Sequence, residues 1–303
     1  MHLTLSSRLP LPNIPSASGI EITGKHIYMI GDDSPFLFRL NKKLEVLEKI
    51  QIASTKDLAG DRIPKKQKSD WEAMTLVQHK GMNEIFVFGS GSKKKRKVLV
   101  RIGYDEKPVS VKTSSLKELY KKIIKTTGIS KDDLNIEAAA ANKEFLFLFN
   151  RGVNLVLKYK LKEIFSYLDN GSIPTPEVFK INLPSIKNIQ SGFSGATFVP
   201  GENKIIFCAS VENSSNWIDD GEVLGSFIGL IDLEELFQSS KTLEKFPGHT
   251  PDCLPIKEAG QILKIKVESV AVKGLSNKEL ELLLVTDSDG GVSEIIEARL
   301  KEY

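Results

Sequence analysis

The chain has 303 residues, enough for one large all-β domain or two ordinary domains, and in either case enough to bury a substantial core. Its 41% hydrophobic and 27% charged residues are typical of a globular protein in water. The 42 basic and 39 acidic residues leave a net charge of +3, which is too small to favour nucleic acid or an anionic membrane as a partner.

Two further features bear on the cellular setting. No segment reaches the roughly 18 to 20 apolar residues that a membrane-spanning helix needs, and residues 1–15 lack the apolar run of a signal peptide. The two cysteines, Cys208 and Cys253, are too few for a disulfide framework or a thiolate metal cage. We therefore expect a cytoplasmic protein, or a secreted one if a leader has been removed.

A weak repeat runs along the whole chain. Each copy has a polar or small residue, an apolar residue, an oxygen-bearing side chain, and then an apolar run, a turn and a second apolar strand. The oxygen-bearing third positions are Glu21, Glu72, Glu137, Ser194 and Glu268. They are 51, 65, 57 and 74 residues apart, which is typical of propeller blades with loop insertions.

The segments that follow these positions have the composition of β-strands, since they are short, rich in Ile, Phe, Val and Leu, and bounded by Gly, Asn, Asp or Ser. The predicted second strands are residues 26–31, 84–89, 144–150, 204–209 and 282–286. The predicted third strands are residues 36–40, 98–102, 155–161, 225–230 and 292–300. Outer strands are predicted at residues 44–52, 109–113 and 178–183.

The fifth repeat ends after three strands, and the strand predicted at residues 3–9 would supply its fourth strand and close a ring. Helical insertions are predicted at residues 116–126, 161–168 and 233–243 from their helix-spaced apolar residues. We thus predict an all-β fold: a single β-propeller domain over residues 1–303, with five blades in preference to six. The alternative is two unrelated β-rich domains.

The five repeat positions predict a ring of oxygen-bearing side chains, because the residues that open the innermost strands of a propeller meet around its channel. Four crowded carboxylates repel one another, so they must be protonated in part or neutralised by a cation. Carboxylate and hydroxyl oxygens suit a hard cation, Ca²⁺ before Mg²⁺, and the lack of His and Cys argues against zinc. Glu21, Glu72, Glu137, Ser194 and Glu268 are therefore candidate metal ligands; ordered water around protonated glutamates is the alternative.

The loops after the second strands are expected on the same face of the ring. Two of them carry acids, at Asp32 and Asp33 and at residues 287–290, and two carry bases, at residues 93–97 and at Arg151. A divalent cation beside Arg and Lys is an arrangement that binds phosphate-like anions. Lys93, Arg151 and Asp287 are the candidate substrate-binding residues. Residues 93–97 also fit a solvated hairpin tip, and the acidic insertion at residues 212–225 fits either a lid or a plain surface loop.

Short anchors spread along the chain resemble an uncharacterised bacterial β-propeller family and the calcium-activated nucleotidases of the apyrase family. They include residues 18–21, 71–73, 137–139, 147–151, 192–201 and 267–268. The nucleotidase resemblance implies a five-bladed propeller whose central Ca²⁺ is held by Glu72, Glu137, Ser194 and Glu268, with Glu21 in place of a family serine. It also implies that Asp32, Asp33 and Arg151, the candidate catalytic residues, contact phosphate or metal-bound water. The long loops between the anchors do not match.

Two functions are consistent with these patterns. The first is a Ca²⁺-dependent hydrolase of a phosphorylated or otherwise anionic small molecule, including the variant of lactone or sugar-ester hydrolysis. The second is a non-enzymatic binding propeller with a structural cation at its hub. In both cases we expect a monomer with no nucleic-acid or membrane partner.

Overall fold

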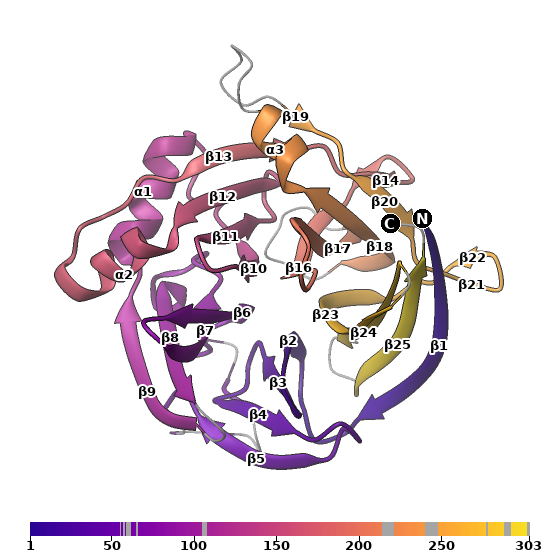
Figure 1. Cartoon of the computed structure of the whole chain (residues 1–303), viewed down its shortest axis with the longest axis horizontal. Coiled ribbons are helices and arrows are strands. Elements are labelled where there is room, and N and C mark those ends of the chain that lie inside the picture. The colour runs from indigo at the N-terminus through magenta and orange to yellow at the C-terminus, as the bar shows by residue number, and fades with distance from the viewer. Residues whose placement is uncertain are drawn as a thin grey trace.

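A computed structural model describes residues 1–54, 56, 58, 62–64, 66–104, 108–213, 221–239, 248–276, 278–287 and 292–301. It is a five-bladed β-propeller whose blades stand around a central channel (Figure 1). Each blade has four antiparallel strands with the first strand innermost, and one blade carries a fifth, parallel strand at its outer edge. The predicted fold class is therefore confirmed, blade number included.

The strands follow the chain from blade to blade. Blade 1 contains β2 (Ala17–Thr23), β3 (His26–Gly31), β4 (Phe36–Leu40) and β5 (Val46–Gln51). Blade 2 contains β6 (Trp71–His79), β7 (Met82–Gly89), β8 (Val98–Tyr104) and β9 (Pro108–Ser115). Blade 3 contains β10 (Ile136–Ala141), β11 (Phe145–Asn150), β12 (Leu155–Lys160) and β13 (Glu177–Ile181).

Blade 4 contains β16 (Gly192–Phe198), β17 (Lys204–Asn213), β18 (Glu222–Asp232) and β20 (Asp252–Pro255). Blade 5 contains β23 (Lys266–Ser276), β24 (Glu279–Asp287), β25 (Ser293–Lys301) and the N-terminal strand β1 (His2–Leu11). Between them lie the short strands β14 (Ser185–Ile186), β15 (Ile189–Gln190), β21 (Lys257–Glu258) and β22 (Gln261–Ile262). Strand β19 (Gly248–His249) adds a parallel edge to blade 3.

The ring is closed by the pairing predicted from the sequence. Strand β1 runs antiparallel to β25, with Leu3 opposite Leu300 and Leu11 opposite Ser293. The closure pairs the outer edge of β25, which would otherwise be open.

The core is divided among the interfaces between blades. Five large clusters of buried side chains each join two neighbouring blades, so that every blade packs on both of its neighbours. The alternation of strand side chains explains this arrangement, because successive residues point to opposite faces of a sheet. In β11, for example, Phe147 and Phe149 pack toward blade 4, while Leu146 and Leu148 pack toward blade 2.

Three helices lie outside the blades, close to the positions predicted for them. They are α1 (Lys117–Thr127), α2 (Leu161–Asn170) and α3 (Leu233–Ser239). The predicted end of the third helix, residues 240–243, lies outside the described residues. In the part of the chain that is described, no helix is long and apolar enough to cross a membrane.

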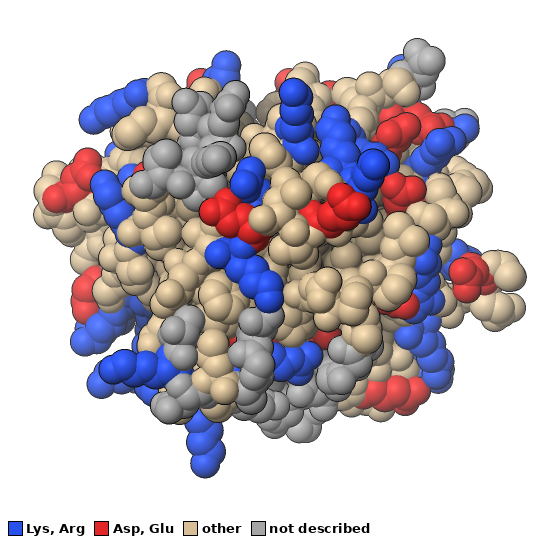
Figure 2. All heavy atoms as spheres, turned by 90° about the horizontal axis from the view of Figure 1, so that it is seen from below, with Lys and Arg blue, Asp and Glu red and all other residues tan. Residues whose placement is uncertain are grey.

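The outer side of the molecule at the bottom of Figure 1, next to blades 1 and 2, carries charges of both signs. Figure 2 shows basic and acidic side chains interspersed there. Several such pairs lie on exposed strands, for example Arg39 Nη2 with Glu48 Oε2 at 2.9 Å. This side therefore has no extended region of one charge sign.

Candidate functional site at the channel mouth

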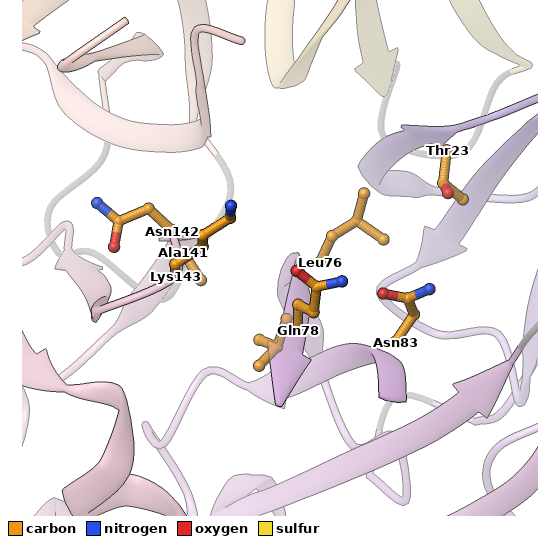
Figure 3. A pocket seen from close by; sticks show the side chains of 8 residues that line it. Thr23, Leu76, Gln78, Asn83, Ala141, Asn142 and Lys143 are labelled. Atoms are coloured by element: carbon orange, nitrogen blue, oxygen red, sulfur yellow. The ribbon is translucent and has the colours of Figure 1, made fainter. Parts of the chain in front are cut away.

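The two ends of the channel differ in chemistry. At the end where the inner strands finish, a pocket of about 300 Å³ is lined from three blades by polar residues, apolar residues and one lysine, with no acidic side chain among them (Figure 3). The lining residues are Thr23, Leu76, Val77, Gln78, Asn83, Ala141, Asn142 and Lys143. The other end, where the inner strands begin, carries the predicted acids. We call this acidic end the channel mouth.

A β-bulge opens every inner strand at the mouth. In each blade the pairing between first and second strands shifts by one residue at the same place, and one residue is left unpaired. A bulge bends the strand locally and redirects the side chain of the extra residue. The bulged residues are Ser18, Glu72, Glu137, Ser194 and Glu268.

The predicted register of the ring is therefore right in four blades and wrong in blade 1, where the equivalent residue is Ser18 and not Glu21. Glu21 lies three residues further along β2 and pairs with Tyr28. Its carboxylate accepts a hydrogen bond from the Thr197 hydroxyl at 3.5 Å. Burial raises the pKa of Glu21 to about 8. Hydrogen bonds from Thr197 and from the backbone at Ile22 and Leu76 lower the pKa and so oppose this shift. Glu21 thus lies deeper in the channel than the ring.

The two ring serines fasten one blade to the next. The Ser18 hydroxyl donates a hydrogen bond to the Trp71 carbonyl oxygen at 2.5 Å, and the Ser194 hydroxyl donates to the Val267 carbonyl oxygen at 2.6 Å. In both cases the acceptor residue directly precedes the bulged glutamate of another blade. The serine hydroxyls therefore fix the backbone that positions Glu72 and Glu268.

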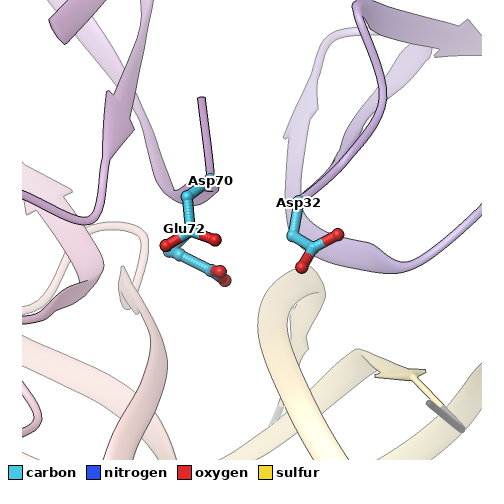
Figure 4. A group of neighbouring side chains, drawn as sticks. All are labelled: Asp32, Asp70 and Glu72. Carbon is cyan, nitrogen blue, oxygen red and sulfur yellow. The ribbon is translucent and has the colours of Figure 1, made fainter. Parts of the chain in front are cut away.

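Three carboxylates converge on one side of the mouth. Asp32 follows β3, Asp70 precedes β6, and Glu72 is the bulged residue of β6 (Figure 4). One oxygen from each lies within 4.8 Å of the other two. Two oxygens that bind one Ca²⁺ at about 2.4 Å are at most about 4.8 Å apart. This acidic triad is therefore compact enough for a hard cation.

Basic side chains already reach the triad. The Lys68 ammonium forms ion pairs with Asp32 and, at 3.0 Å, with Asp70 Oδ1. Asp70 Oδ2 accepts hydrogen bonds at 2.6 Å from both Arg96 Nη1 and the Ser90 hydroxyl. A metal at the triad would have to share these carboxylates with Lys68 or displace its ammonium group. The sequence prediction did not name Lys68 or Asp70 as site residues, and it included Arg96 only as part of the basic run of residues 93–97.

The opposite side of the mouth holds a second charged group. Lys266 Nζ lies 3.0 Å from Glu268 Oε1 and 2.9 Å from Glu212 Oε1. Arg151 Nη2 lies 3.3 Å from Glu212 Oε1, and Arg151 Nη1 lies 3.9 Å from Glu137 Oε2. Five charged side chains from three blades are thus linked around Glu212.

Arg151 is held rigidly at this position. It is 4% exposed, and its Nη1 donates to the Ser210 hydroxyl at 3.0 Å. The side chain passes over Gly192, where an added Cβ would lie 2.5 Å from Arg151 Cγ. A glycine is therefore required at the start of β16 for Arg151 to reach the mouth.

The ring glutamates carry strongly perturbed pKa values. Burial raises the pKa of Glu72 well above its ordinary range, and the carboxylates of Glu137, Asp70 and Asp32 raise it further. Burial also raises the pKa of Glu268 to about 8, although the Lys266 ammonium opposes the shift. Burial also raises the pKa of Glu137, although the positive charges of Arg151 and Lys266 oppose this shift. A bound cation would relieve this repulsion.

Asp33 lies beside the triad in a partly buried position. Its pKa is raised to about 6, first by burial and then by the Asp32 carboxylate, while Arg62 and Lys68 oppose the shift. The Asp287 carboxylate contributes to the same rise, which places Asp287 near Asp33 across the mouth. Asp33 Oδ1 is buried and has no hydrogen-bond partner among the described residues.

The remaining sequence predictions have mixed outcomes. Lys93 is exposed, and the buried member of the basic run is Arg96. Residues 288–290, from the predicted acidic loop, and residues 214–220, from the acidic insertion, lie outside the described residues. The metal and substrate roles of the ring and loop residues stay predictions.

The comparisons with known proteins place the chain in a family. The model of the family of unknown function DUF6929 matches residues 13–300. The chain belongs to this family. No curated protein matches it in sequence, so the resemblance to the calcium-activated nucleotidases gains no support there.

Solved structures that resemble this chain do so at low sequence identity, and only the first of the three below reaches a TM-score of 0.50. Glutaminyl cyclase from Myxococcus xanthus is 10% identical with a TM-score of 0.50, over 99% of this chain and 96% of that one. An α-L-arabinanase from Cellvibrio cellulosa is 13% identical with a TM-score of 0.46, over 93% and 90% of the two chains. An aldose sugar dehydrogenase from Streptomyces coelicolor is 12% identical with a TM-score of 0.46, over 98% and 97%. Identities this low show the fold alone.

Proposed function

We propose that this DUF6929 protein is a divalent-metal-dependent hydrolase, with Ca²⁺ the preferred ion, that acts on a phosphorylated or otherwise anionic small molecule. The observation that carries the proposal is the acidic triad of Asp32, Asp70 and Glu72, whose oxygens lie within 4.8 Å of one another. Around it stand basic side chains from several blades. Acids for a metal and bases for an anion thus share one opening.

The triad would hold the metal, with Glu137, Ser194 and Glu268 as further candidate ligands across the mouth. A bound divalent cation would polarise a phosphoryl or carbonyl oxygen and lower the pKa of a water molecule. Ca²⁺ fits this set better than Mg²⁺, because it accepts six to eight oxygen ligands in irregular geometry.

The protein side chains have distinct roles in this scheme. Arg151, fixed by Ser210 and Glu212, would orient the anionic group of the substrate. Asp33 is the candidate general base, since its buried Oδ1 has no hydrogen-bond partner among the described residues. Water would attack the electrophilic centre, the bond to the leaving oxygen would break, and the proton of the water would pass to Asp33.

A metal titration tests the first step. Isothermal calorimetry with Ca²⁺ should detect binding to the wild-type protein, and Asp32→Asn should weaken it by about tenfold or more because one charged ligand is lost. Lys68→Met should strengthen binding, since the ammonium group competes for Asp32 and Asp70. A matched control, Lys42→Met, removes an ammonium at an exposed turn of blade 1 and should leave the affinity for Ca²⁺ unchanged. Equal affinity for Ca²⁺ in all four proteins would exclude a metal at the triad.

A hydrolysis panel tests the second step. Nucleotides, phosphomonoesters, lactones and sugar esters should be tried with Ca²⁺, with Mg²⁺ and with chelator, on the wild type and on Asp33→Asn. Turnover that requires the metal and is lost in Asp33→Asn would support the proposal. Metal binding without turnover of any substrate would rule out the hydrolase.

The alternative is a binding propeller whose charged mouth is structural. One observation favours it: Asp70 is already engaged by Lys68, Arg96 and Ser90. In that case Lys68 neutralises the triad permanently, and Ca²⁺ would not raise the melting temperature of the wild type.

A further inference from the structure

The small net charge of the chain conceals a strongly basic segment. Residues 93–131 contain thirteen basic and three acidic residues, a net charge of +10, so the rest of the chain carries −7. An asymmetry of this size indicates a polyanionic partner for the basic part.

The fold brings this segment together at one surface. The backbone N–H of Leu116 donates to the carbonyl oxygen of Lys97 at 2.9 Å, so that α1 begins beside the basic turn of residues 93–97. Leu119, Tyr120 and Ile123 bury the inner side of α1, which leaves its lysines outside. We call the resulting set the α1 lysine surface: Lys93, Lys94, Lys95, Lys97, Lys117, Lys121, Lys125 and Lys131.

Positive charge at this surface is only partly neutralised. Partial burial lowers the pKa of Lys97, and the ammonium groups of Lys131, Lys121 and Lys117 lower it further. Glu118 pairs with Lys121 at 2.9 Å within the helix. The remaining repulsion among ammonium groups would be relieved by a ligand that brings several negative charges at once.

The turn that carries part of the α1 lysine surface is connected to the channel mouth. Arg96 belongs to the same short turn, η1 (Lys94–Arg96), but it is buried and reaches Asp70 at 2.6 Å. The backbone N–H of Ile136, at the start of β10, donates to the Ser90 carbonyl oxygen at 2.8 Å. The loop that carries the exposed lysines therefore also borders the acidic triad.

The chemistry of this surface favours consecutive phosphates without bases. Lysine acts as a point charge that binds phosphate with little geometric selection. Tyr120, the aromatic residue of α1, is buried and donates to the Gly89 carbonyl oxygen at 2.8 Å, so it offers no ring for a base to stack on.

We propose that the α1 lysine surface binds a linear polyphosphate chain and directs its terminal phosphate to the channel mouth. The binding step stands on the lysines alone; the statement that the bound chain is a substrate rests on the proposed function. Lysines one helical turn apart, such as Lys117 and Lys121, would contact phosphates that are not adjacent in the chain, because their Cβ atoms are about 5–6 Å apart.

Calorimetry with linear inorganic polyphosphate in the presence of chelator tests the binding step without turnover. The double variant Lys117→Glu/Lys131→Glu should weaken binding by about tenfold or more and reduce its salt dependence. Glutamate at the first position of a helix is favourable, so Lys117→Glu should not unfold α1. The control, Lys42→Glu/Lys43→Glu, makes the same charge change at an exposed turn of blade 1 and should leave binding within about twofold of wild type.

The outcomes separate the two proposals. Equal weakening in both double variants, or in neither, would overturn the assignment of the surface. Single-stranded DNA with the same number of phosphates should bind more weakly; equal or tighter binding would overturn the choice of polyphosphate. Asp32→Asn should keep polyphosphate binding in chelator, because the binding step does not need the metal. Polyphosphate binding by the wild type without turnover under Ca²⁺ or Mg²⁺ would refute the hydrolase and leave the binding inference standing.

Discussion

Replacing Asp70 by asparagine isolates the charge that neutralises Arg96. Asp70 adopts a left-handed backbone conformation, with φ of 58°, and asparagine tolerates this conformation better than most residues. The side chains of Asp70 and Arg96 are 6% and 8% exposed. The substitution therefore keeps the backbone and the shape of the site and removes one buried negative charge.

The expected loss of stability follows from the buried guanidinium that remains. Removing one partner of a buried ion pair typically costs about 3–5 kcal/mol, because the other charge stays without its counter-ion. We take the lower end, about 3 kcal/mol, because the asparagine oxygen still accepts a hydrogen bond. For a chain of this length, the typical entropy of unfolding means that a loss of about 0.6 kcal/mol in unfolding free energy lowers the melting temperature by one degree. The melting temperature should therefore fall by about 5 °C.

Calorimetric melting of the chelator-treated protein measures this change. Asp132→Asn, at an exposed position, is the matched control and should shift the melting temperature by less than about 1 °C. The double variant Asp70→Asn/Arg96→Met should recover part of the loss, because it removes the unpaired cation as well. A decrease in Asp70→Asn no larger than that of the control would refute the reasoning.

Three further predictions concern the channel and the ring. Burial raises the pKa of Glu21 in the folded state to about 8, so the folded state loses stability as pH rises from about 4.5 to 8. Glu21→Gln should remove this loss. Its melting temperature should be above that of the wild type at pH 9 and not at pH 5. Ser194→Ala deletes the hydrogen bond to the Val267 carbonyl oxygen and should cost about 1–2 kcal/mol in urea unfolding, whereas Ser194→Thr should cost less if the bond is what matters. Gly152→Ala would place a Cβ 2.1 Å from the Asp133 carbonyl oxygen. The overlap should destabilise the fold by about 1–3 kcal/mol and lower the urea midpoint accordingly. An unchanged midpoint would contradict the close approach of Gly152 to Asp133.

The blades were predictable because each inner strand is followed at a short distance by an apolar second strand. Residues 26–31 and 36–40, for example, were predicted with the bounds that β3 and β4 have in the structure. The outer strand of blade 4, β20, was not predicted, since Asp252–Pro255 is short and contains both a proline and an aspartate. Its pairing with β18 is a tertiary contact that no local pattern records.

The site was less predictable, because its geometry depends on bulges and on loops between blades. Glu21 resembled the other ring acids in sequence, but the bulge of β2 falls on Ser18, and a hydrophobic pattern does not locate a bulge. Lys68 and Asp70 come from the loop that joins blades 1 and 2. Arg96 did carry a signal, as the one arginine in a run of lysines, since arginine is favoured for buried ion pairs.

The antiparallel pairing of β1 with β25 has a consequence for synthesis on the ribosome. Strand β1 emerges first, yet its partner is separated from it by some 290 residues and is made last. Until then the fifth blade cannot form, and the apolar residues that face it from blades 1 and 4 stay uncovered. A nascent chain of this protein therefore depends on protection of those surfaces, and a circular permutant with its new ends between two blades should finish each sheet in the order of translation.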